Sequence, residues 1–314
     1  MTATKSEWYF IVNPRAGSGK TMSEWVPAER KLEKLGIPYV TAYTDYKNHA
    51  TELARRAAAE GFRRIAAVGG DGSLHEVLGG ICRWCDESGT DTSGFRLAVV
   101  PIGSGNDWIK SMKVPHDVDD VVGLIALDSF VPMDVVRVDM ADGGFSYLAN
   151  CGGVGFDSHV CKTVNLQKER GMRGKRIYIN ALIRTIRTLK AINIQVIADG
   201  AEVFSGPCFS VAMGNGRYSG SGMRQVPLAD TNDDFLDVMI VPKVPVTTML
   251  KEVPRLFSGT VNESENVISL RCRTLSIVPL DADSADIVEV DGEIEGRLPL
   301  SISMVNRKIG ALKG

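Results

Sequence analysis

Long apolar runs and an excess of charge of one sign are both missing from this sequence of 314 residues. No stretch approaches the roughly 18 consecutive apolar residues of a membrane-spanning helix, so we expect none. Lysine and arginine number 36 against 38 aspartates and glutamates, and the net charge of -2 gives no reason to expect nucleic acid as a main partner. The polar residues 1–7 lead straight into an apolar segment and predict no secretion signal. These absences favour a cytoplasmic location.

The six cysteines are scattered, and most lie among apolar residues, as reduced thiols of a protein core do. Cys82 and Cys85 form a C-x-x-C pair, which has to be weighed as a zinc or redox site. A zinc site needs a second ligand pair at comparable spacing, and the sequence has none. A redox pair is expected at the N-terminus of a helix, whereas this pair falls at the end of one. We therefore interpret the spacing as coincidence.

Several well-known motifs are also absent, and each absence argues against a class of function. Neither the G-x-G-x-x-G turn of dinucleotide-binding domains nor the G-x-S-x-G and H-E-x-x-H motifs of hydrolases occurs. Gly19-Lys20-Thr21 looks like the end of a Walker A loop, but Pro14 stands where that loop requires glycine. What remains is a small-residue turn that either meets phosphate through its amides or only joins a strand to a helix.

The most informative stretch runs from Val68 to Gly80, between an apolar strand at residues 62–68 and a helix. Glycines around Asp71 let a phosphate approach the backbone N–H groups at the start of the helix, because no Cβ stands in the way. An aspartate there would repel a bare phosphate, which suggests a divalent cation between the two. The alternative is a tight turn in which the aspartate caps the helix.

Two more strand-to-helix turns of this kind occur, at residues 13–17 and 101–107. We expect strands at residues 8–13, 38–43, 62–68 and 95–100, and helices at residues 23–35, 50–60 and 118–127. This alternation predicts an N-terminal α/β domain with a mostly parallel sheet, whose binding crevice lies at the carboxyl ends of the strands.

Beyond residue 128 the pattern changes to short strands joined by turns, which predicts a second, β-rich domain. The expected strands are residues 131–138, 145–149, 192–198, 208–213, 236–241 and 267–273, and two helices, residues 173–190 and 246–257, interrupt them. The first of these helices is basic, because no acidic residue occurs between Arg170 and Ala198. Its basic face is either simply solvated or attracts anionic lipid headgroups or nucleotide phosphates.

Two acidic segments lie in the β-rich half. Residues 227–237 place four aspartates in a loop before a strand, where dense oxygen ligands suit Mg²⁺ or Ca²⁺, although a turn with solvated acids explains them equally well. Residues 288–296 form a hairpin tip that carries Asp291 and Glu293, which are either functional or, as is usual on a turn, only solvated.

Five motifs occur in the order seen in the soluble bacterial diacylglycerol kinases, and the sequence resembles this family over essentially its whole length. They are Asn13-Pro14-Arg15-Ala16-Gly17, Gly69-Gly70-Asp71-Gly72-Ser73, Pro101-Ile102-Gly103-Ser104-Gly105-Asn106-Asp107, residues 227–238 and Asp291-Gly292-Glu293. The family includes sphingosine and ceramide kinases and is distantly related to NAD kinases. The resemblance implies an α/β plus all-β fold with the active site in the cleft between two domains. Its parts would be a nucleotide-binding domain (residues 1–128), a β-sandwich-like lipid-binding domain (129–299) and a C-terminal segment that returns to the first domain (300–314).

The resemblance also implies roles for individual residues. The ATP site would be lined by Asn13, Pro14, Arg15, Ala16, Gly17, Thr44, Gly70, Asp71, Gly72, Ser73, Leu74, His75, Glu76 and Ser104. Asp71 would help to hold the Mg²⁺ of Mg·ATP, and Glu293 would be the general base that takes the proton from the lipid hydroxyl. A structural Mg²⁺ would be held by Asp230, Asp233 and the backbone carbonyl of Phe235. Asn106 and Asp107 would belong to the cleft without a fixed role.

The sequence departs from the family pattern at a few positions. Ser73 and Ser104 replace threonine but keep the hydroxyl, and His75 replaces a frequent asparagine. Asp234 replaces a glycine that needs a positive φ if the turn has its usual form, which puts the structural metal site in question.

These observations together predict an ATP- and Mg²⁺-dependent lipid kinase that phosphorylates the hydroxyl of diacylglycerol, giving phosphatidate, or of another lipid such as a sphingoid base. Because the lipid lies in a bilayer and no span is present, we expect peripheral contact with the inner face of the membrane. The alternatives are an NAD kinase-like enzyme and a non-catalytic nucleotide or lipid sensor. The acceptor lipid, the docking surface and the formation of a homodimer stay open.

Overall fold

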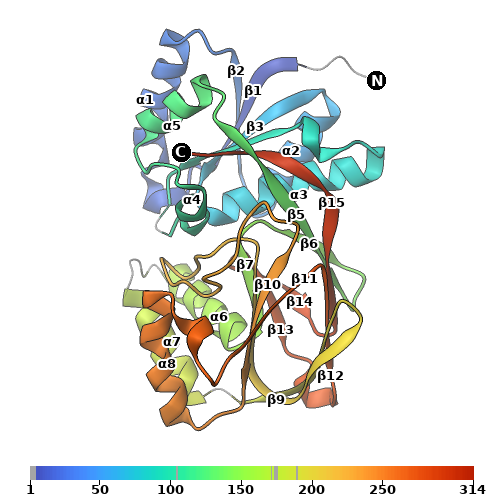
Figure 1. Ribbon diagram of the computed structural model, residues 1–314. Helices are drawn as coiled ribbons and strands as arrows, with labels where there is room; N and C mark the ends of the chain where they lie inside the picture. The colour runs from blue at the N-terminus through green and yellow to red at the C-terminus, as the bar shows by residue number, and fades with distance from the viewer. Residues whose placement is uncertain (1–4, 104, 171, 173–175, 189) are drawn as a thin grey trace. The chain divides into compact units, whose positions relative to one another are not determined.

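The computed structural model describes residues 5–103, 105–170, 172, 176–188 and 190–314. The chain divides into two compact units (Figure 1). Unit 1 comprises residues 1–135 and 306–314, and unit 2 comprises residues 136–305. The chain passes between the units twice, within strands β5 (Phe130–Met140) and β15 (Leu300–Leu312).

Unit 1 is built on a parallel sheet in the order β2-β1-β3-β4, and the last residues of β15 extend it beside β4. The strands are β1 (Lys5–Val12), β2 (Tyr39–Tyr43), β3 (Phe62–Gly69) and β4 (Arg96–Pro101). Strands β1, β3 and β4 are almost wholly buried, as parallel strands covered by helices on both faces are. The predicted α/β domain with a mostly parallel sheet is confirmed.

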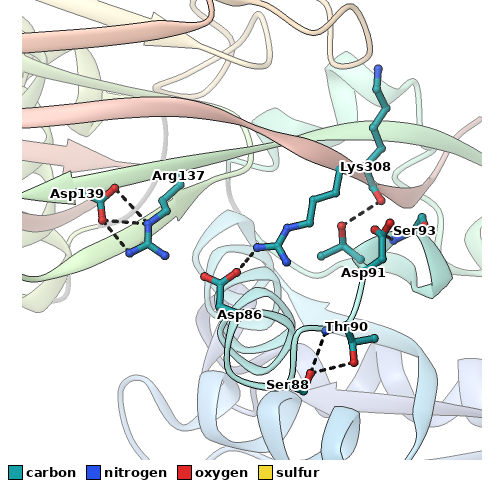
Figure 2. Close-up of polar contacts among 10 residues, drawn as sticks. Asp86, Ser88, Thr90, Asp91, Ser93, Arg137, Asp139 and Lys308 are labelled. Carbon is teal, nitrogen blue, oxygen red and sulfur yellow. Dashed lines mark hydrogen bonds and ion pairs between the residues drawn. The ribbon is translucent and has the colours of Figure 1, made fainter.

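The helices of unit 1 follow the strands as the alternation predicts. They are α1 (Thr21–Lys34), α2 (His49–Ala59), α3 (Asp71–Ser88), α4 (Asp107–Met112) and α5 (Val118–Ala126), with short 3₁₀ turns η1 (Ala16–Gly19) and η2 (Thr92–Gly94). Helix α3 ends at Gly89, which has a φ of 67°, and Ser88 and Thr90 join their hydroxyls across this end (Figure 2). The side chain of Asp91 then accepts the N–H of Ser93 and caps η2.

The C-terminal part of β15 is bound to unit 1 by contacts from several of its elements. Its Gly310 and Ala311 pair with β4, and the carbonyl of Lys308 accepts a hydrogen bond of 3.1 Å from the Thr92 hydroxyl. The Lys308 ammonium lies 2.9 Å from the carboxylate of Asp134, which is 2% exposed. A buried carboxylate is stable only when it is paired in this way, so the ion pair fixes the end of the chain to β5.

Unit 2 is an antiparallel sheet in the order β14-β13-β7-β9-β8-β12-β15, with β10 beside β9, and β11 beside β10. Its strands are β6 (Phe145–Leu148), β7 (Cys151–Gly155), β8 (Ile192–Ala198), β9 (Ala201–Gly214), β10 (Leu236–Pro242), β11 (Ile268–Cys272), β12 (Thr274–Pro279), β13 (Ile287–Val290) and β14 (Glu293–Arg297). Branched aliphatic side chains such as Val154, Val196, Val211 and Ile277 fill its core. The predicted β-rich second domain is confirmed.

The described residues of unit 2 contain three α-helices, so the prediction of two was wrong. They are α6 (Phe156–Glu169), α7 (Arg176–Thr188) and α8 (Val246–Ser258). The missed helix, α6, starts directly after β7 and buries Phe156, Val160 and Val164 at a spacing of four residues, a helical signal hidden by the glycine-rich strand before it. Residues 173–175 and 189 of the predicted basic helix lie outside the described residues.

None of the six cysteines, all within the described ranges, is in a disulfide, and Cys82 and Cys85 are buried in α3. Burial raises the pKa of the Cys85 thiol to about 12, which removes the thiolate that metal binding or redox chemistry needs. Cys82 and Cys85 are therefore residues of the protein core and not a metal or redox site. Of the helices in the described part of the chain, none is long and apolar enough to cross a membrane.

Alanine substitutions at two neighbouring glycines of α3 are expected to change the stability of the protein in opposite directions. A Cβ at Gly80 would collide with the Thr51 carbonyl of α2 and lie 2.7 Å from the Ala54 Cβ, whereas a Cβ at Gly79 would meet nothing within 4 Å. We expect Gly80→Ala to lower the free energy of unfolding by about 1–3 kcal/mol, and Gly79→Ala to raise it by about 0.5–1 kcal/mol because alanine favours the helix. Urea unfolding of both variants is the measurement, and effects of the same sign would refute the close packing of α2 against α3.

Candidate active site

Three turns of unit 1 follow the carboxyl ends of neighbouring parallel strands, β1, β3 and β4, and hydrogen bonds link them. The side-chain amide of Asn13, after β1, lies 3.5 Å from the Ser73 hydroxyl in the first turn of α3. The N–H of Ile102, after β4, donates to the Gly69 carbonyl at 2.9 Å. Parallel strands bring their carboxyl ends to one edge of a sheet, and ligands of α/β proteins bind at that edge.

The turn after β1 exposes backbone and positive charge. Asn13 accepts the N–H of Arg15 through its side chain at 3.0 Å, and Gly17 and Ser18 both have left-handed backbones, with φ of 55° and 62°. Arg15 and Lys20 are exposed on either side. Such a turn presents amide groups together with cationic side chains, which suits an anion.

The turns after β3 and β4 approach each other so closely that only glycine fits. A Cβ at Gly103 would lie 2.8 Å from the Gly70 Cα. Asn106, which is 3% exposed, donates its amide N–H groups to the carbonyls of Pro101 and Gly103, at 3.3 and 3.1 Å. Its Oδ1 atom is buried and has no hydrogen-bond partner among the residues that the structure describes, and it lies 3.6 Å from where a Cβ of Gly70 would stand. A buried acceptor of this kind needs a donor, and a bound ligand or water can supply one.

Asp71 lies at the start of α3 and joins it to α4. Its two carboxylate oxygens accept the backbone N–H groups of Asp107 and Trp108, at 3.0 and 3.1 Å. The aspartate therefore caps helix α4. The side chain is half-buried, and a carboxylate oxygen that accepts an N–H group can also contact a cation.

The other residues predicted to line the nucleotide site differ in what they can contact. Glu76 accepts the N–H groups of Asn48 and Ala50 at 3.2 and 3.1 Å and caps α2. Leu74 is 2% exposed and belongs to the core. The half-buried Thr44 follows β2, and its N–H donates to the Val12 carbonyl at 2.9 Å. Ser104 lies outside the described residues.

In unit 2, the hairpin between β13 and β14 is held rigidly at its tip. Asp291 and Gly292 have positive φ values of 51° and 90°, the backbone of a type I′ turn. The carboxylate of Asp291 accepts the N–H groups of both Ala149 and Asn150 at 2.8 Å. The Gly292 carbonyl accepts the side-chain amide of Asn165 at 2.9 Å, and its N–H donates to Glu289.

Glu293 is the first residue of β14 and is half-buried beside this tip. Because the residues before it are fixed from three sides, its backbone position is set by the fold of unit 2. Asp291, predicted only as part of a motif, thus holds the turn that precedes Glu293, and its place in a two-residue turn did not reveal these contacts.

Two further carboxyl groups of unit 2, Glu289 and Asp157, were missed by sequence reasoning. Burial raises the pKa of Glu289 well above its ordinary value. The hydrogen bond from the Gly292 N–H lowers the pKa by less than that, and the negative charge of Asp157 raises it further. Burial also raises the pKa of Asp157 to about 6, although the Ser210 hydroxyl donates to its carboxylate. The signal for Glu289 was an acid within the apolar strand β13.

Asp157→Asn is expected to change the pH dependence of stability. The pKa of this carboxyl is raised from 3.8 to about 6 on folding, so the folded state binds its proton more tightly than the unfolded state does. Ionisation of the group therefore opposes folding as the pH rises from about 4 to about 6, and the penalty is constant above that window. We expect the free energy of unfolding of the variant to gain about 2 kcal/mol on the wild type between pH 4 and pH 7. Urea unfolding across this range, with the exposed Asp283→Asn as control, checks it, and parallel curves would contradict it.

The aspartate loop before β10 is ordered by local bonds and by an arginine. Asp230 accepts the N–H of Asn232, and Asp233 accepts the N–H of Phe235, both at 3.1 Å. Arg271 of β11 forms an ion pair with Asp233. Asp234 has a φ of 64°, so aspartate adopts here the left-handed backbone expected of the glycine it replaces.

No group of three or more histidine, cysteine, aspartate or glutamate side chains within the described ranges could hold a metal ion. The arginine already supplies positive charge to Asp233, so the contacts of this loop do not call for a metal. The ligand set Asp230, Asp233 and Phe235 stays a prediction.

Known proteins resemble this chain in both halves. Residues 7–138 match the diacylglycerol kinase catalytic domain, and residues 152–312 match the YegS C-terminal NAD kinase beta sandwich-like domain. A protein of Xanthomonas campestris pv. campestris, named "Probable lipid kinase YegS-like", is 30% identical over 244 residues, which cover 76% of this chain and 74% of that protein. A protein of Mycobacterium tuberculosis, named "Diacylglycerol kinase", is 25% identical over 304 residues, which cover 96% and 94%.

The crystal structure of a diacylglycerol kinase from Bacillus anthracis str. Sterne shares the fold, with a TM-score of 0.72 and 18% identity over 98% of this chain and 97% of that one. The fold, both domain matches and the two relatives agree with the resemblance found from the motifs. The chain therefore belongs to the lipid kinase family built on the diacylglycerol kinase catalytic domain, and it is an enzyme of that family.

Proposed function

We propose that this enzyme transfers the γ-phosphate of ATP to the hydroxyl of a membrane lipid, with diacylglycerol as the first candidate and a sphingoid base as the second. The observation that carries the proposal is the set of three linked turns at the carboxyl ends of β1, β3 and β4, two of them glycine-rich strand-to-helix turns, in a chain of the lipid kinase family. Phosphoryl transfer needs positioned phosphates, neutralised charge and a base near the acceptor hydroxyl, and the two units carry candidates for each.

The nucleotide is proposed to bind unit 1 along the residues predicted from the motifs. The left-handed turn at Gly17 and Ser18, the cationic Arg15 and the N-terminus of α3 are suited to its phosphates. The buried Oδ1 of Asn106, for which no described residue supplies a hydrogen bond, is a candidate acceptor for a donor on the nucleotide or on an ordered water. Leu74 and Glu76 would contribute by holding α3 in place, because the first is buried and the second caps α2.

Glu293 of unit 2 is proposed to accept the proton of the lipid hydroxyl. As the proton leaves, the oxygen attacks the γ-phosphorus, the bond from that phosphorus to the β–γ bridging oxygen breaks, and ADP departs. The rigid turn before Glu293 supports this role, because a base must be held within hydrogen-bond reach of its proton.

Mg²⁺ is proposed to accompany ATP and to neutralise phosphate charge when bound, and Asp71 is the carboxylate that fits it in unit 1. The supporting observation is the half-buried carboxylate of Asp71, which the backbone N–H groups of Asp107 and Trp108 hold in place. Asp230, Asp233 and the carbonyl of Phe235 remain proposed ligands of a second, structural ion. A rise in melting temperature with added Mg²⁺ that is lost in Asp230→Asn would support that second site.

The decisive experiment uses γ-labelled ATP and Mg²⁺ with a total bacterial lipid extract in mixed micelles and, separately, with NAD. Label in the organic phase supports the proposal, and mass spectrometry of the labelled lipid then identifies the acceptor. Label on NAD would instead make the protein an NAD kinase-like enzyme. Binding of ATP without transfer to either acceptor would indicate a nucleotide sensor and refute the proposal.

A further inference from the structure

Glu289 of β13 is a buried acid of unit 2 that neither the proposed nucleotide site nor the proposed transfer step uses. It is 8% exposed, and its carboxyl group accepts the N–H of Gly292 in the turn between β13 and β14. Gly292 directly precedes Glu293, the proposed base. Glu289 therefore contacts the backbone that carries the base, and a residue in such a place can act on a reaction without touching the substrate.

A missing side chain on β7 makes room for a second acid beside Glu289. Glu289 pairs with Gly153 across the β13–β7 ladder, so these two residues point to the same face of the sheet. A Cβ at Gly153 would lie 3.1 Å from the Oδ2 atom of Asp157, which reaches this face from α6. Because glycine leaves this place open, the carboxyl groups of Asp157 and Glu289 are neighbours on one face.

The charges that face Glu289 are negative. Burial raises the pKa of its carboxyl group most, and the charges of Asp157 on α6, Asp291 in the turn and Glu293 on β14 raise that pKa further. Strands β6 and β7, which also pack beside β13, contain no charged residue. An ionised Glu289 would thus stand among like charges.

Cations on the same elements do not offset these charges. Among the side chains that the structure describes on α6 and β14, His159 hydrogen-bonds to Asp286 at 2.9 Å, and Arg297 donates to a backbone carbonyl at 3.1 Å. Lys162 of α6 is exposed. A buried carboxyl group that has acids and no cation beside it favours its protonated form, which is the form expected of Glu289.

Helix α6 holds the other side of the same turn, because the Asn165 side chain donates to the Gly292 carbonyl at 2.9 Å. We propose that Glu289 is a positioning residue of phosphoryl transfer: by accepting the Gly292 N–H, it fixes the backbone from which Glu293 reaches the acceptor hydroxyl. It does so as a neutral carboxylic acid. The inference rests on the proposed function, since Glu293 is the proposed base.

Loss of the proton from Glu289 is expected to release the turn. The resulting carboxylate would face the charges of Asp157 and Asp291, and a buried charge without a partner moves toward water. That movement takes the acceptor away from the Gly292 N–H. We therefore expect kcat to fall as the pH rises through the raised pKa of Glu289, while the KM for ATP, whose proposed site is in unit 1, stays constant.

The first measurement is hydrogen exchange of the Gly292 amide, followed by NMR on the full chain with isotope-labelled glycine and no substrates. Glu289→Gln keeps the shape and an accepting oxygen without a charge, whereas Glu289→Met puts an apolar side chain of similar length in the buried site. We expect the Gly292 amide to exchange at least about tenfold faster in Glu289→Met, the equivalent of one lost hydrogen bond, and at the wild-type rate in Glu289→Gln.

The second measurement is kcat with ATP and lipid across neutral and alkaline pH. Glu289→Met should lower kcat about 10- to 100-fold at an unchanged KM for ATP, because a displaced base costs a factor of this size. Glu289→Gln should keep most of the wild-type kcat at neutral pH and lose the alkaline decline. Asp157→Asn should move that decline to lower pH, because it removes a charge that raises the pKa of Glu289.

Asp199→Ala is the matched control for the loss of an acid that holds a turn. Asp199 lies between β8 and β9 of the same unit and accepts the N–H groups of Arg273 and Thr274 at 2.9 and 2.8 Å. Its variant should lose stability, while kcat, the pH profile and the exchange of Gly292 stay those of the wild type. The melting temperature of each variant shows that the measured changes belong to folded protein.

The proposal is overturned if Glu289→Met matches the wild type in both Gly292 exchange and kcat, or if Glu289→Gln is as slow as Glu289→Met. A single pH profile shared by the wild type and Glu289→Gln would contradict the role of the neutral acid. If the wild type phosphorylates no lipid, the proposed function fails. Faster exchange of Gly292 in Glu289→Met alone would then still support the hold of Glu289 on the turn.

Discussion

Replacement of Glu293 by glutamine is expected to lower the rate of phosphoryl transfer by about 10³-fold, the scale of a lost general base. Glutamine has the same shape but cannot accept the proton of the attacking hydroxyl. The turn before it is held by Asp291, Gly292 and Glu289, none of which the substitution touches, so the backbone of β14 should not move. Label transfer to lipid under saturating ATP is the measurement, with ATP affinity measured in parallel.

Glu295→Gln is the matched control for this variant, because it removes a carboxylate from the same strand two residues away. We expect it to keep most of the activity. If Glu293→Gln transfers phosphate as fast as the wild type, or if it loses ATP binding together with transfer, the assignment of Glu293 as the base is wrong.

Asp71→Asn is expected to reduce transfer by about 10²-fold and to raise the Mg²⁺ concentration that gives half-maximal rate. The carboxylate accepts two backbone N–H groups of α4, and asparagine can accept only with its carbonyl oxygen, so its amide would face one of these donors. The variant should therefore also lose about 1–2 kcal/mol of stability. Kinetics at varied Mg²⁺ and urea unfolding separate the two effects.

The control for Asp71→Asn is Asp117→Ala, which removes the side-chain acceptor at the N-cap of α5. Asp117 accepts the N–H groups of Asp119 and Asp120 at 2.9 and 3.1 Å, so its variant loses a helix cap of the same kind. It should lose stability while its Mg²⁺ dependence stays that of the wild type. If Asp71→Asn shows the same result, Asp71 is a helix cap and has no part in holding the metal.

The elements of unit 1 were predicted closely because their signals are local. The alternation of strand, turn and helix, the glycines and the apolar spacing can each be recognised within a few consecutive residues. Helices α2 and α5 accordingly begin and end within one residue of their predicted bounds. Helix α6 was missed because its apolar residues directly follow a glycine-rich strand, which obscured the start of the helical spacing.

The roles of the acidic residues could be predicted only in part. Asp71 was expected either to meet a cation or to cap its own helix, and its cap is in fact on α4, 36 residues further along the chain. Glu76 was assigned to the nucleotide, yet its carboxylate caps α2. No local pattern encodes these pairings, because they depend on which helices pack together.

By itself, the sequence determined the fold class, the five ordered motifs and membership of the lipid kinase family, since glycines, acids and apolar periods are properties of short segments. Only the tertiary structure decided how those residues are used. It joined Asp291 to Ala149, 142 positions apart in sequence, and it buried the Oδ1 atom of Asn106 without a hydrogen-bond partner in the described part of the chain. The physical reason is that burial and hydrogen bonding between distant segments exist only once the chain has packed.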